Sequence, residues 1–157
     1  MLMKKVLSSG LVFAGMLSVP AQMANAELPD SKAEYRNDPR LERLKRFFQK
    51  RDCPAGDLSA EFLHAADEHS LDWRLLPGIA MVESGGGRSA PHNNLFGWEN
   101  GKARFVSGRA GIHDVARSLA TSRLYRNKDV DGILRMYNHG ADYPGYVKSV
   151  MKRISES

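Results

Sequence analysis

A single glutamate at the end of an apolar segment has the surroundings that point most directly to chemistry. Glu83 follows segment 75–82, which is apolar on every side and is therefore expected to form a buried helix. Burial and the negative end of the helix dipole both favour the protonated form of a carboxyl group. Gly85-Gly86-Gly87 is expected to end the helix and to leave the acid beside open space. A protonated carboxylic acid in that position can donate its proton to the oxygen of a glycosidic bond as the bond breaks.

The alternative interpretation is that Glu83 is an ordinary solvated residue in the last turn of a helix, as most glutamates at helix ends are. We favour the functional interpretation because segment 75–82 offers no polar face to which a solvated side chain could belong. The same glycines could be read as a dinucleotide-binding loop. They follow a helical pattern rather than a strand, so that interpretation is disfavoured.

Three motifs in sequence order resemble those of the lysozyme-like superfamily. Segment 71–85 resembles its catalytic helix, including the Glu83-Ser84 pair found in lytic transglycosylases and in endo-β-N-acetylglucosaminidase autolysins. Asn93-Asn94-Leu95-Phe96-Gly97 resembles the second motif of the glucosaminidases. Tyr137-Asn138, together with segment 146–150, is similar to the closing motifs of both groups. The resemblance covers about residues 58 to 154.

The resemblance implies a role for several residues. Glu83 would be the general acid, and the hydroxyl of Tyr137 would face it. The residues implied to contact the glycan are Ser84, Asn94, Phe96, Trp98 and Tyr146. Structural interpretations stand beside these: Asn94 suits a turn, and Trp98, Tyr137 and Tyr146 could be core aromatic residues.

A second catalytic acid is not clearly marked. Glycosidases commonly use two carboxylates, and the candidates are Glu99 and Asp142. Glu99 could equally form a surface ion pair with Lys102, and Asp142 could be a helix cap. A second acid is not required in every case, because lytic transglycosylases work with one and an N-acetyl sugar can supply its own acetamido nucleophile.

The implied function is that of an exported, endo-β-N-acetylglucosaminidase-like hydrolase acting on peptidoglycan glycan strands. His139 stands where transglycosylases commonly have a small residue, and the predicted hairpin is shorter than in glucosaminidases, so the subclass stays open. A lytic transglycosylase is the nearest alternative. A non-catalytic glycan-binding or cell-wall adaptor module is the alternative from another class.

The N-terminus predicts export. Lys4-Lys5, the apolar stretch 6–19 and Ala24-Asn25-Ala26 are typical of a signal peptide covering residues 1–26, and the apolar stretch is short for a membrane anchor. We therefore expect a secreted or periplasmic monomer without a stable membrane anchor. The formal net charge of +5 includes Lys4 and Lys5, so removal of the signal peptide would leave +5 − 2 = +3. This mildly basic charge suits an anionic cell wall but is too small to decide the function, and it gives no support for nucleic-acid binding.

The remaining pattern predicts a mainly α, lysozyme-like (α+β) domain at 58–157. A lead-in with a basic amphipathic helix at 27–57 is expected to lay its apolar stripe on that domain. Helices are expected around Leu119, from Asp129 as an N-cap, and from Pro144 onward. Asn100-Gly101 is the central pair of a predicted type I′ turn, which would make residues 96–105 a small β-hairpin forming a cleft wall.

No metal or cofactor is expected from the sequence. The five histidines, His64, His69, His92, His113 and His139, show no metal-ligand spacing. Cys53 is the sole cysteine, so no internal disulfide can form.

Overall fold

The computed structural model describes residues 31–157, so the predicted signal peptide lies outside the described residues. The described part is mainly helical and contains no strand. No helix within it is long and apolar enough to cross a membrane. The elements are α1 (Ser31–Glu34), α2 (Pro39–Gln49), η2 (Pro54–Leu58), α3 (Ser59–Glu68), α4 (Leu75–Ser84), η3 (Pro91–Asn93), α5 (Gly108–Thr121), α6 (Val130–Tyr137) and α7 (Tyr143–Ser155).

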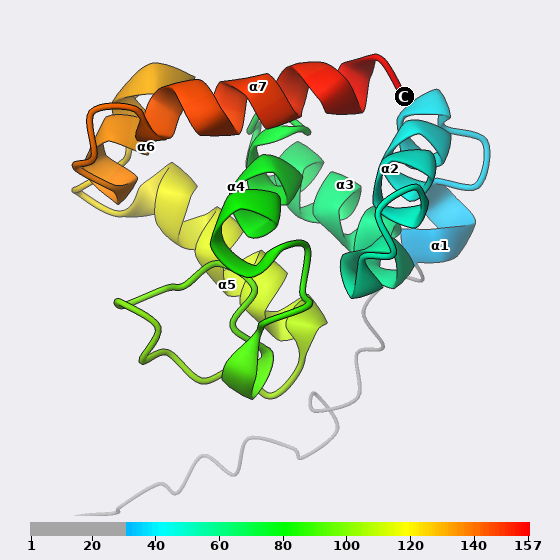
Figure 1. The fold of residues 1–157 in the computed structure, drawn as a ribbon, viewed down its shortest axis with the longest axis horizontal. Helices are drawn as coiled ribbons and strands as arrows, with labels where there is room; N and C mark the ends of the chain where they lie inside the picture. The colour runs from blue at the N-terminus through cyan, green and yellow to red at the C-terminus, as the bar shows by residue number, and fades with distance from the viewer. Residues whose placement is uncertain (1–30) are drawn as a thin grey trace, which may run out of the picture.

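Helix α4 lies at the centre of the fold, as its apolar sequence predicted. Every residue from Leu75 to Ala80 is buried. Pro77 falls in the first turn, where a missing backbone N–H costs no helical hydrogen bond. Helix α7 lies across α4 (Figure 1), and Gly78 permits the close approach. A Cβ atom at Gly78 would lie 3.1 Å from Met151 Cγ and 3.2 Å from Val147 Cγ1.

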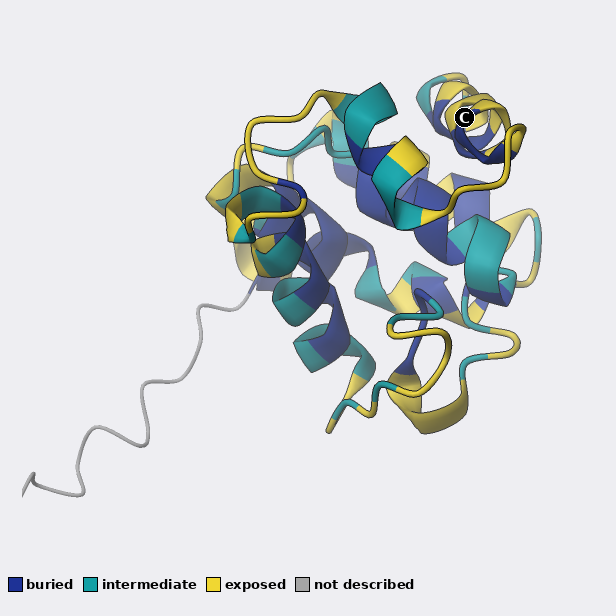
Figure 2. Ribbon diagram, turned by 90° about the vertical axis from the view of Figure 1, so that its left-hand side faces the viewer, coloured by how far each residue is buried: buried dark blue, intermediate teal, exposed yellow. Residues whose placement is uncertain are grey.

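Helix α2 belongs to the same core rather than to a separate lead-in. Its apolar stripe, Leu41, Leu44, Phe47 and Phe48, is buried as expected. The Phe48 ring stacks on Phe62 of α3 at 5.9 Å, and Phe62 meets Phe96 edge-on at 6.4 Å. Figure 2 shows the buried residues on the inward sides of the helices and the exposed residues mainly on the loops.

The predicted β-hairpin is not formed. The turn itself forms where predicted: Asn100 and Gly101 adopt left-handed φ values of 55° and 80°, as a type I′ turn requires, and the Lys102 N–H donates to the Glu99 carbonyl at 3.1 Å. Glu99 is also left-handed, at φ 55°, so the chain leaves strand geometry directly before the turn. The predicted turn is therefore confirmed, and the predicted strands on either side of it are wrong.

A buried side chain explains why no strand ladder follows this turn. The Asn94 amide accepts a hydrogen bond from the Trp98 N–H at 2.9 Å. It donates to the Trp98 carbonyl at 3.1 Å and to the Ala103 carbonyl at 3.3 Å. One bond of the expected pair is made, from the Ala103 N–H to the Trp98 carbonyl at 3.2 Å. The Asn94 amide lies between the Trp98 N–H and the Ala103 carbonyl and takes the place of the second bond.

An ion network joins α2 to α3 on the surface. The Arg40 guanidinium donates to both oxygens of Asp67, at 2.8 and 2.7 Å, and to the N-cap residue Asp38. The Tyr35 hydroxyl donates to Asp67 at 2.9 Å. The hydrogen bonds from Arg40 lower the pKa values of Asp67 and Asp38, against the opposing effect of burial.

This network predicts a specific pH dependence of stability. A carboxyl whose folded pKa is lowered stabilises the protein above its unfolded pKa, about 3.9 for Asp, and loses that contribution as the pH falls through the folded value. Arg40→Gln should therefore lower the free energy of unfolding by about 1 kcal/mol at pH 6, the upper end for partly exposed ion pairs. The difference from wild type should shrink below about pH 4.

Urea unfolding from pH 7 to pH 2 measures this difference. Arg46→Gln is the matched control, because Arg46 lies on the same helix and makes no ion pair within the described residues. An Arg40→Gln difference that stays constant down to pH 2 would contradict the linkage to Asp67 and Asp38.

A larger side chain is expected to have opposite effects on stability at Gly145 and at Gly78. Gly145 lies in α7 with open space around its Cβ position, so Gly145→Ala should raise the free energy of unfolding by about 0.5–1 kcal/mol. Gly78→Val should lower it by about 1–3 kcal/mol, because the new methyls would press on Met151 and Val147. Thermal or urea unfolding of both variants checks the pair. Equal changes in the free energy of unfolding of the two variants would show that α4 and α7 are not closely packed at Gly78.

Candidate active site

A groove of about 520 Å³ opens beside the C-terminal end of α4. Its walls come from four parts of the chain: the end of α4, the loop after η3, the segment between α5 and α6, and the end of α6. The lining residues are Glu83, Gly97, Trp98, Glu99, Asn100, Gly101, Leu124, Tyr125, Tyr137 and Asn138. The loop predicted as a hairpin thus forms one wall of the groove, although it does so without strands.

Glu83 is held at the edge of this groove by the end of its helix. Gly85 adopts the left-handed conformation at φ 62° and ends α4, as predicted. The Glu83 side chain is partly buried and lines the groove. Its carboxylate also interacts with the Tyr143 hydroxyl.

The loop backbone passes directly against this carboxylate at Gly97. Gly97 has φ +60°, and a Cβ atom built there would lie 2.8 Å from Glu83 Oε2. A larger residue would be strained and would also collide with the acid. Glycine at this position therefore lets the loop close over Glu83.

Two stacked tyrosines lie behind the acid. The rings of Tyr137 and Tyr143 are parallel within 2° with centroids 6.0 Å apart. Burial raises the pKa of both hydroxyls, and the charge of Glu83 raises them further. The Tyr143 hydroxyl is buried, and its interaction with the Glu83 carboxylate is the second cause of its raised pKa.

Tyr137 holds the loop rather than the acid. Its hydroxyl donates a 2.6 Å hydrogen bond to the Phe96 carbonyl, next to Gly97. The Tyr137 side chain still lines the groove together with Glu83. Tyr137 is therefore a positioning residue in this structure: it fixes the backbone that packs on Glu83.

An aromatic wall faces the acid across the groove. Trp98 lies 6.0 Å from Tyr125 and 5.6 Å from Tyr137, measured between ring centroids. Leu124, half exposed, extends the apolar surface. Flat apolar rings beside a carboxyl group can take up the apolar faces of a ligand that carries its polar groups at its edges.

Three residues implied to contact substrate are instead buried. Ser84 is 4 % exposed, and its hydroxyl donates to the Ala80 carbonyl and accepts from the Gly87 N–H. Phe96 is fully buried against Phe62. Asn94 is 3 % exposed, with its amide used by the loop backbone. They shape the groove from below because core packing and backbone hydrogen bonds occupy their side chains.

The remaining candidates divide between the groove and its surroundings. Trp98 lines the groove, as does Glu99, which is exposed. No ion pair between Glu99 and Lys102 occurs among the described residues. Asp142 and the 62 % exposed Tyr146 lie on α7 or at its start and do not line the groove. Gly86 does not line the groove: its carbonyl accepts a hydrogen bond from the Ala55 N–H, so this segment packs on η2.

Sequence reasoning missed Tyr143, Tyr125 and Leu124. Tyr143 could have been found, because its spacing of four from Val147 places it on the buried face of α7, whereas Tyr146 falls on the outer face. Tyr125 and Leu124 lie in a connecting segment without periodicity. Only the fold brings that segment to the groove.

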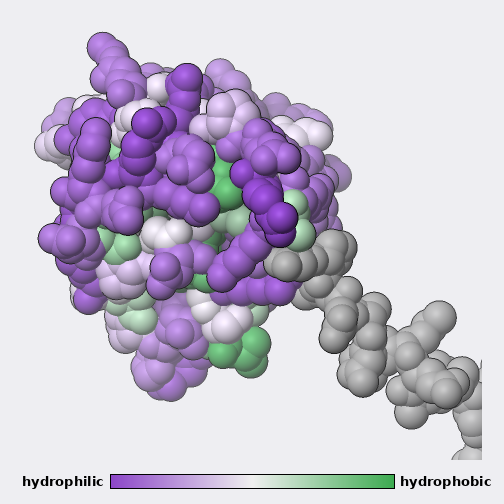
Figure 3. Space-filling model, turned by 90° about the vertical axis from the view of Figure 1, so that its right-hand side faces the viewer, coloured by the Kyte–Doolittle hydropathy of each residue, from purple (hydrophilic) through white to green (hydrophobic). Residues whose placement is uncertain are grey.

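A larger hollow, of about 670 Å³, lies on the face that carries α1 and α2. Figure 3 views the molecule from that side, where hydrophilic residues surround a small apolar opening. Its rim carries Lys32, Arg36, Lys45 and Arg46. We take the groove at Glu83 as the candidate active site, because it combines a carboxyl group with an aromatic wall.

A separate cluster could hold a metal ion. Glu61, His64 and His113 each offer a ligand atom, and these atoms lie within 4.8 Å of one another. Histidine spacing alone missed this cluster because His113 comes from a different helix. The Glu-x-x-His spacing of Glu61 and His64 was the available signal, since it puts both on one helical face.

No protein-family model matches this chain, and no curated protein or solved structure shows significant similarity to it.

The Tyr137 hydrogen bond predicts a measurable cost of removal. Tyr137→Phe keeps the ring and its stacking but leaves the Phe96 carbonyl without its donor, so the free energy of unfolding should fall by about 0.5–1.5 kcal/mol. Amide hydrogen exchange at Gly97 and Trp98 should quicken as the loop loosens. Tyr146→Phe is the matched control on an exposed tyrosine, with an expected change within about 0.5 kcal/mol. Equal changes in the two variants would contradict the positioning role.

Proposed function

We propose that this protein is an exported glycosidase that cleaves peptidoglycan glycan strands, with Glu83 as the general acid. The reaction would be that of an endo-β-N-acetylglucosaminidase-like hydrolase on a lysozyme-like fold. The observation that carries the proposal is the position of Glu83: it lies in the last turn of a helix that is buried from Leu75 to Ala80, and it lines a groove together with aromatic side chains. The mainly helical fold and the motif order agree with this assignment.

The geometry suggests how bond cleavage would proceed. Protonated Glu83 gives its proton to the glycosidic oxygen, the bond from that oxygen to the anomeric carbon breaks, and positive charge develops on the sugar ring. The acetamido oxygen of the same N-acetyl sugar attacks the anomeric carbon and forms a cyclic intermediate. Water then attacks that carbon, the bond from the carbon to the acetamido oxygen breaks and restores the acetamido group, and the Glu83 carboxylate accepts the proton that the water releases.

The aromatic wall supports a carbohydrate as the ligand. Sugar rings present apolar C–H faces and polar hydroxyl edges, which suits a groove lined by Trp98 and Tyr125 on one side and by polar groups at its rim. Tyr143 is the described group best placed to donate to Glu83 after the acid has lost its proton. The raised pKa of Tyr143 keeps its hydroxyl protonated, so it can serve as a donor throughout.

Glu99 is the groove residue that could act as a second catalytic acid. It shares the groove with Glu83, but it is exposed and lies on a turn rather than on a rigid element. We therefore assign the nucleophile to the substrate acetamido group and give Glu99 no essential role.

Glu83→Gln should keep the fold and remove activity. Glutamine matches the shape of glutamate but cannot transfer the proton, and general acid catalysis contributes about 10²–10⁴-fold. The rate of turbidity loss of purified peptidoglycan measures activity, and the melting temperature verifies folding. Glu99→Gln is the matched control in the same groove and should retain most of the wild-type rate. Near wild-type lysis by Glu83→Gln would end the proposal, and equal losses in both variants would assign Glu99 as a required second acid.

Mass spectrometry of the products separates the alternatives. Reducing N-acetylglucosamine ends are expected from the proposed hydrolase. Anhydromuramic ends would instead identify a lytic transglycosylase, in which the muramoyl 6-hydroxyl attacks the anomeric carbon. Binding to peptidoglycan without any product would identify a non-catalytic cell-wall module. N-terminal sequencing of the exported protein tests the predicted cleavage after Ala26.

A further inference from the structure

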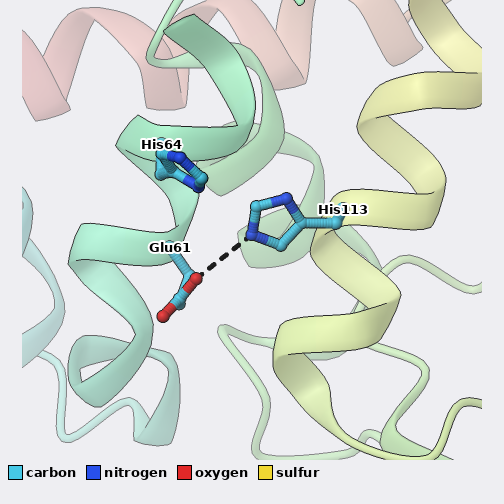
Figure 4. Close-up of side chains that lie close together, drawn as sticks. All are labelled: Glu61, His64 and His113. Carbon is cyan, nitrogen blue, oxygen red and sulfur yellow. Dashed lines mark hydrogen bonds and ion pairs between the residues drawn. The ribbon is translucent and has the colours of Figure 1, made fainter. Parts of the chain in front are cut away.

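Three metal-ligating side chains from two helices converge away from the Glu83 groove. Glu61 and His64 lie three residues apart on α3, and His113 reaches them from α5 (Figure 4). His113 Nε2 lies 3.1 Å from Glu61 Oε2. Two ligand atoms on one tetrahedral zinc ion, each about 2.0–2.1 Å from it, are separated by about 3.3 Å. The separation of these two atoms therefore suits a shared ion as well as a hydrogen bond.

The surroundings of the cluster orient these ligands. His113 Nδ1 lies 3.5 Å from a carboxylate oxygen of Glu68, so the ring has a carboxylate on each side. A metal-binding histidine commonly uses its second nitrogen in this way, since the outer carboxylate fixes the ring and its tautomer. The other oxygen of Glu61 is held by the Ser31 hydroxyl at 2.7 Å. The Glu61 side chain is 10 % exposed, so its position is well defined.

An unsatisfied nitrogen provides an independent observation. His64 Nδ1 is buried and has no hydrogen-bond partner among the described residues. A buried ring nitrogen without a hydrogen-bond partner lowers the stability of the folded protein unless a ligand binds to that histidine. We propose that Glu61, His64 and His113 bind a divalent first-row metal ion, with zinc as the preferred ion and water in the fourth position.

The ligand set favours this class of ion. Two imidazoles and one carboxylate suit zinc and its neighbours, whereas magnesium and calcium prefer oxygen ligands throughout. The competing arrangement is a network without metal, in which Arg109 and His113 share Glu61 Oε2. Arg109 Nε is 3.1 Å from that oxygen, and its side chain is one-third exposed. The guanidinium and a bound ion would therefore compete for this oxygen.

The proposed ion would join α3 to α5 and would not take part in the Glu83 chemistry. None of its ligands lines the groove. An ion that binds only the folded chain shifts the unfolding equilibrium by mass action. Its role is therefore structural, and stability is the appropriate measurement.

The test uses tag-free exported protein stripped of metal with EDTA and then titrated with zinc chloride. Calorimetry should give one zinc per chain, and the melting temperature should rise with the logarithm of free zinc above the dissociation constant. His64→Gln and His113→Gln should abolish both effects, while His139→Gln, which changes an exposed histidine, should leave them intact. Glu68→Gln should weaken zinc binding by about 10-fold, as outer-shell changes do.

Zinc binding that is absent in the wild type, or equal in His64→Gln, His113→Gln and wild type, would overturn the proposal. Circular dichroism establishes whether each variant is folded. If a variant does not fold, cobalt substitution of the wild type decides the question. Intense tetrahedral d–d bands are expected, and the weak spectrum of six-coordinate cobalt would overturn the site. The lysis of peptidoglycan by the metal-free protein is measured separately. A negative result for zinc binding therefore does not bear on the proposed role of Glu83.

Discussion

The burial of α4 from Leu75 to Ala80 is the constraint on which the rest of the structure depends. A helix that is apolar on all sides must be enclosed by other elements, because exposure of any face would cost the hydrophobic free energy of that face. Helix α7 closes against it at Gly78, where there is no side chain to hold the two helices apart. The same enclosure brings the end of the helix to the surface at Glu83. A polar residue can therefore follow a wholly apolar helix without being trapped in the core.

The loop over Glu83 obtains its order from side-chain amides and a tyrosine hydroxyl rather than from a sheet. Asn94 satisfies backbone groups of Trp98 and Ala103, and Tyr137 anchors the Phe96 carbonyl. Such a loop can pass very close to a functional group, as it does at Gly97, because its path is not bound to strand geometry. The loop thereby satisfies its backbone hydrogen-bonding groups and also places Trp98 in the groove wall.

Helix α3 connects the separate parts of the molecule. Phe62 faces the core, Asp67 accepts the Arg40 guanidinium, and Glu61 with His64 faces α5. Each contact uses a different side of one short helix, so the helix cannot rotate without losing all of them. The charged groups lie at the rims of the core, where hydrogen bonds offset the cost of removing them from water.

The sequence alone was enough to predict the main helices and to place Glu83 at the end of one of them. Apolar spacing identified α2, α5 and α7, and the fully apolar run before Glu83 predicted a buried helix that ends at Gly85, because burial patterns and helix stops are local properties. Alternation along residues 96–105 suggested strands, but Asn94 satisfied the backbone instead, and no local pattern reveals such a competition. The tertiary structure alone decided that Tyr125 meets Trp98 and that His113 meets Glu61. Those pairs join distant segments, so the packing of whole helices sets their positions and local spacing does not.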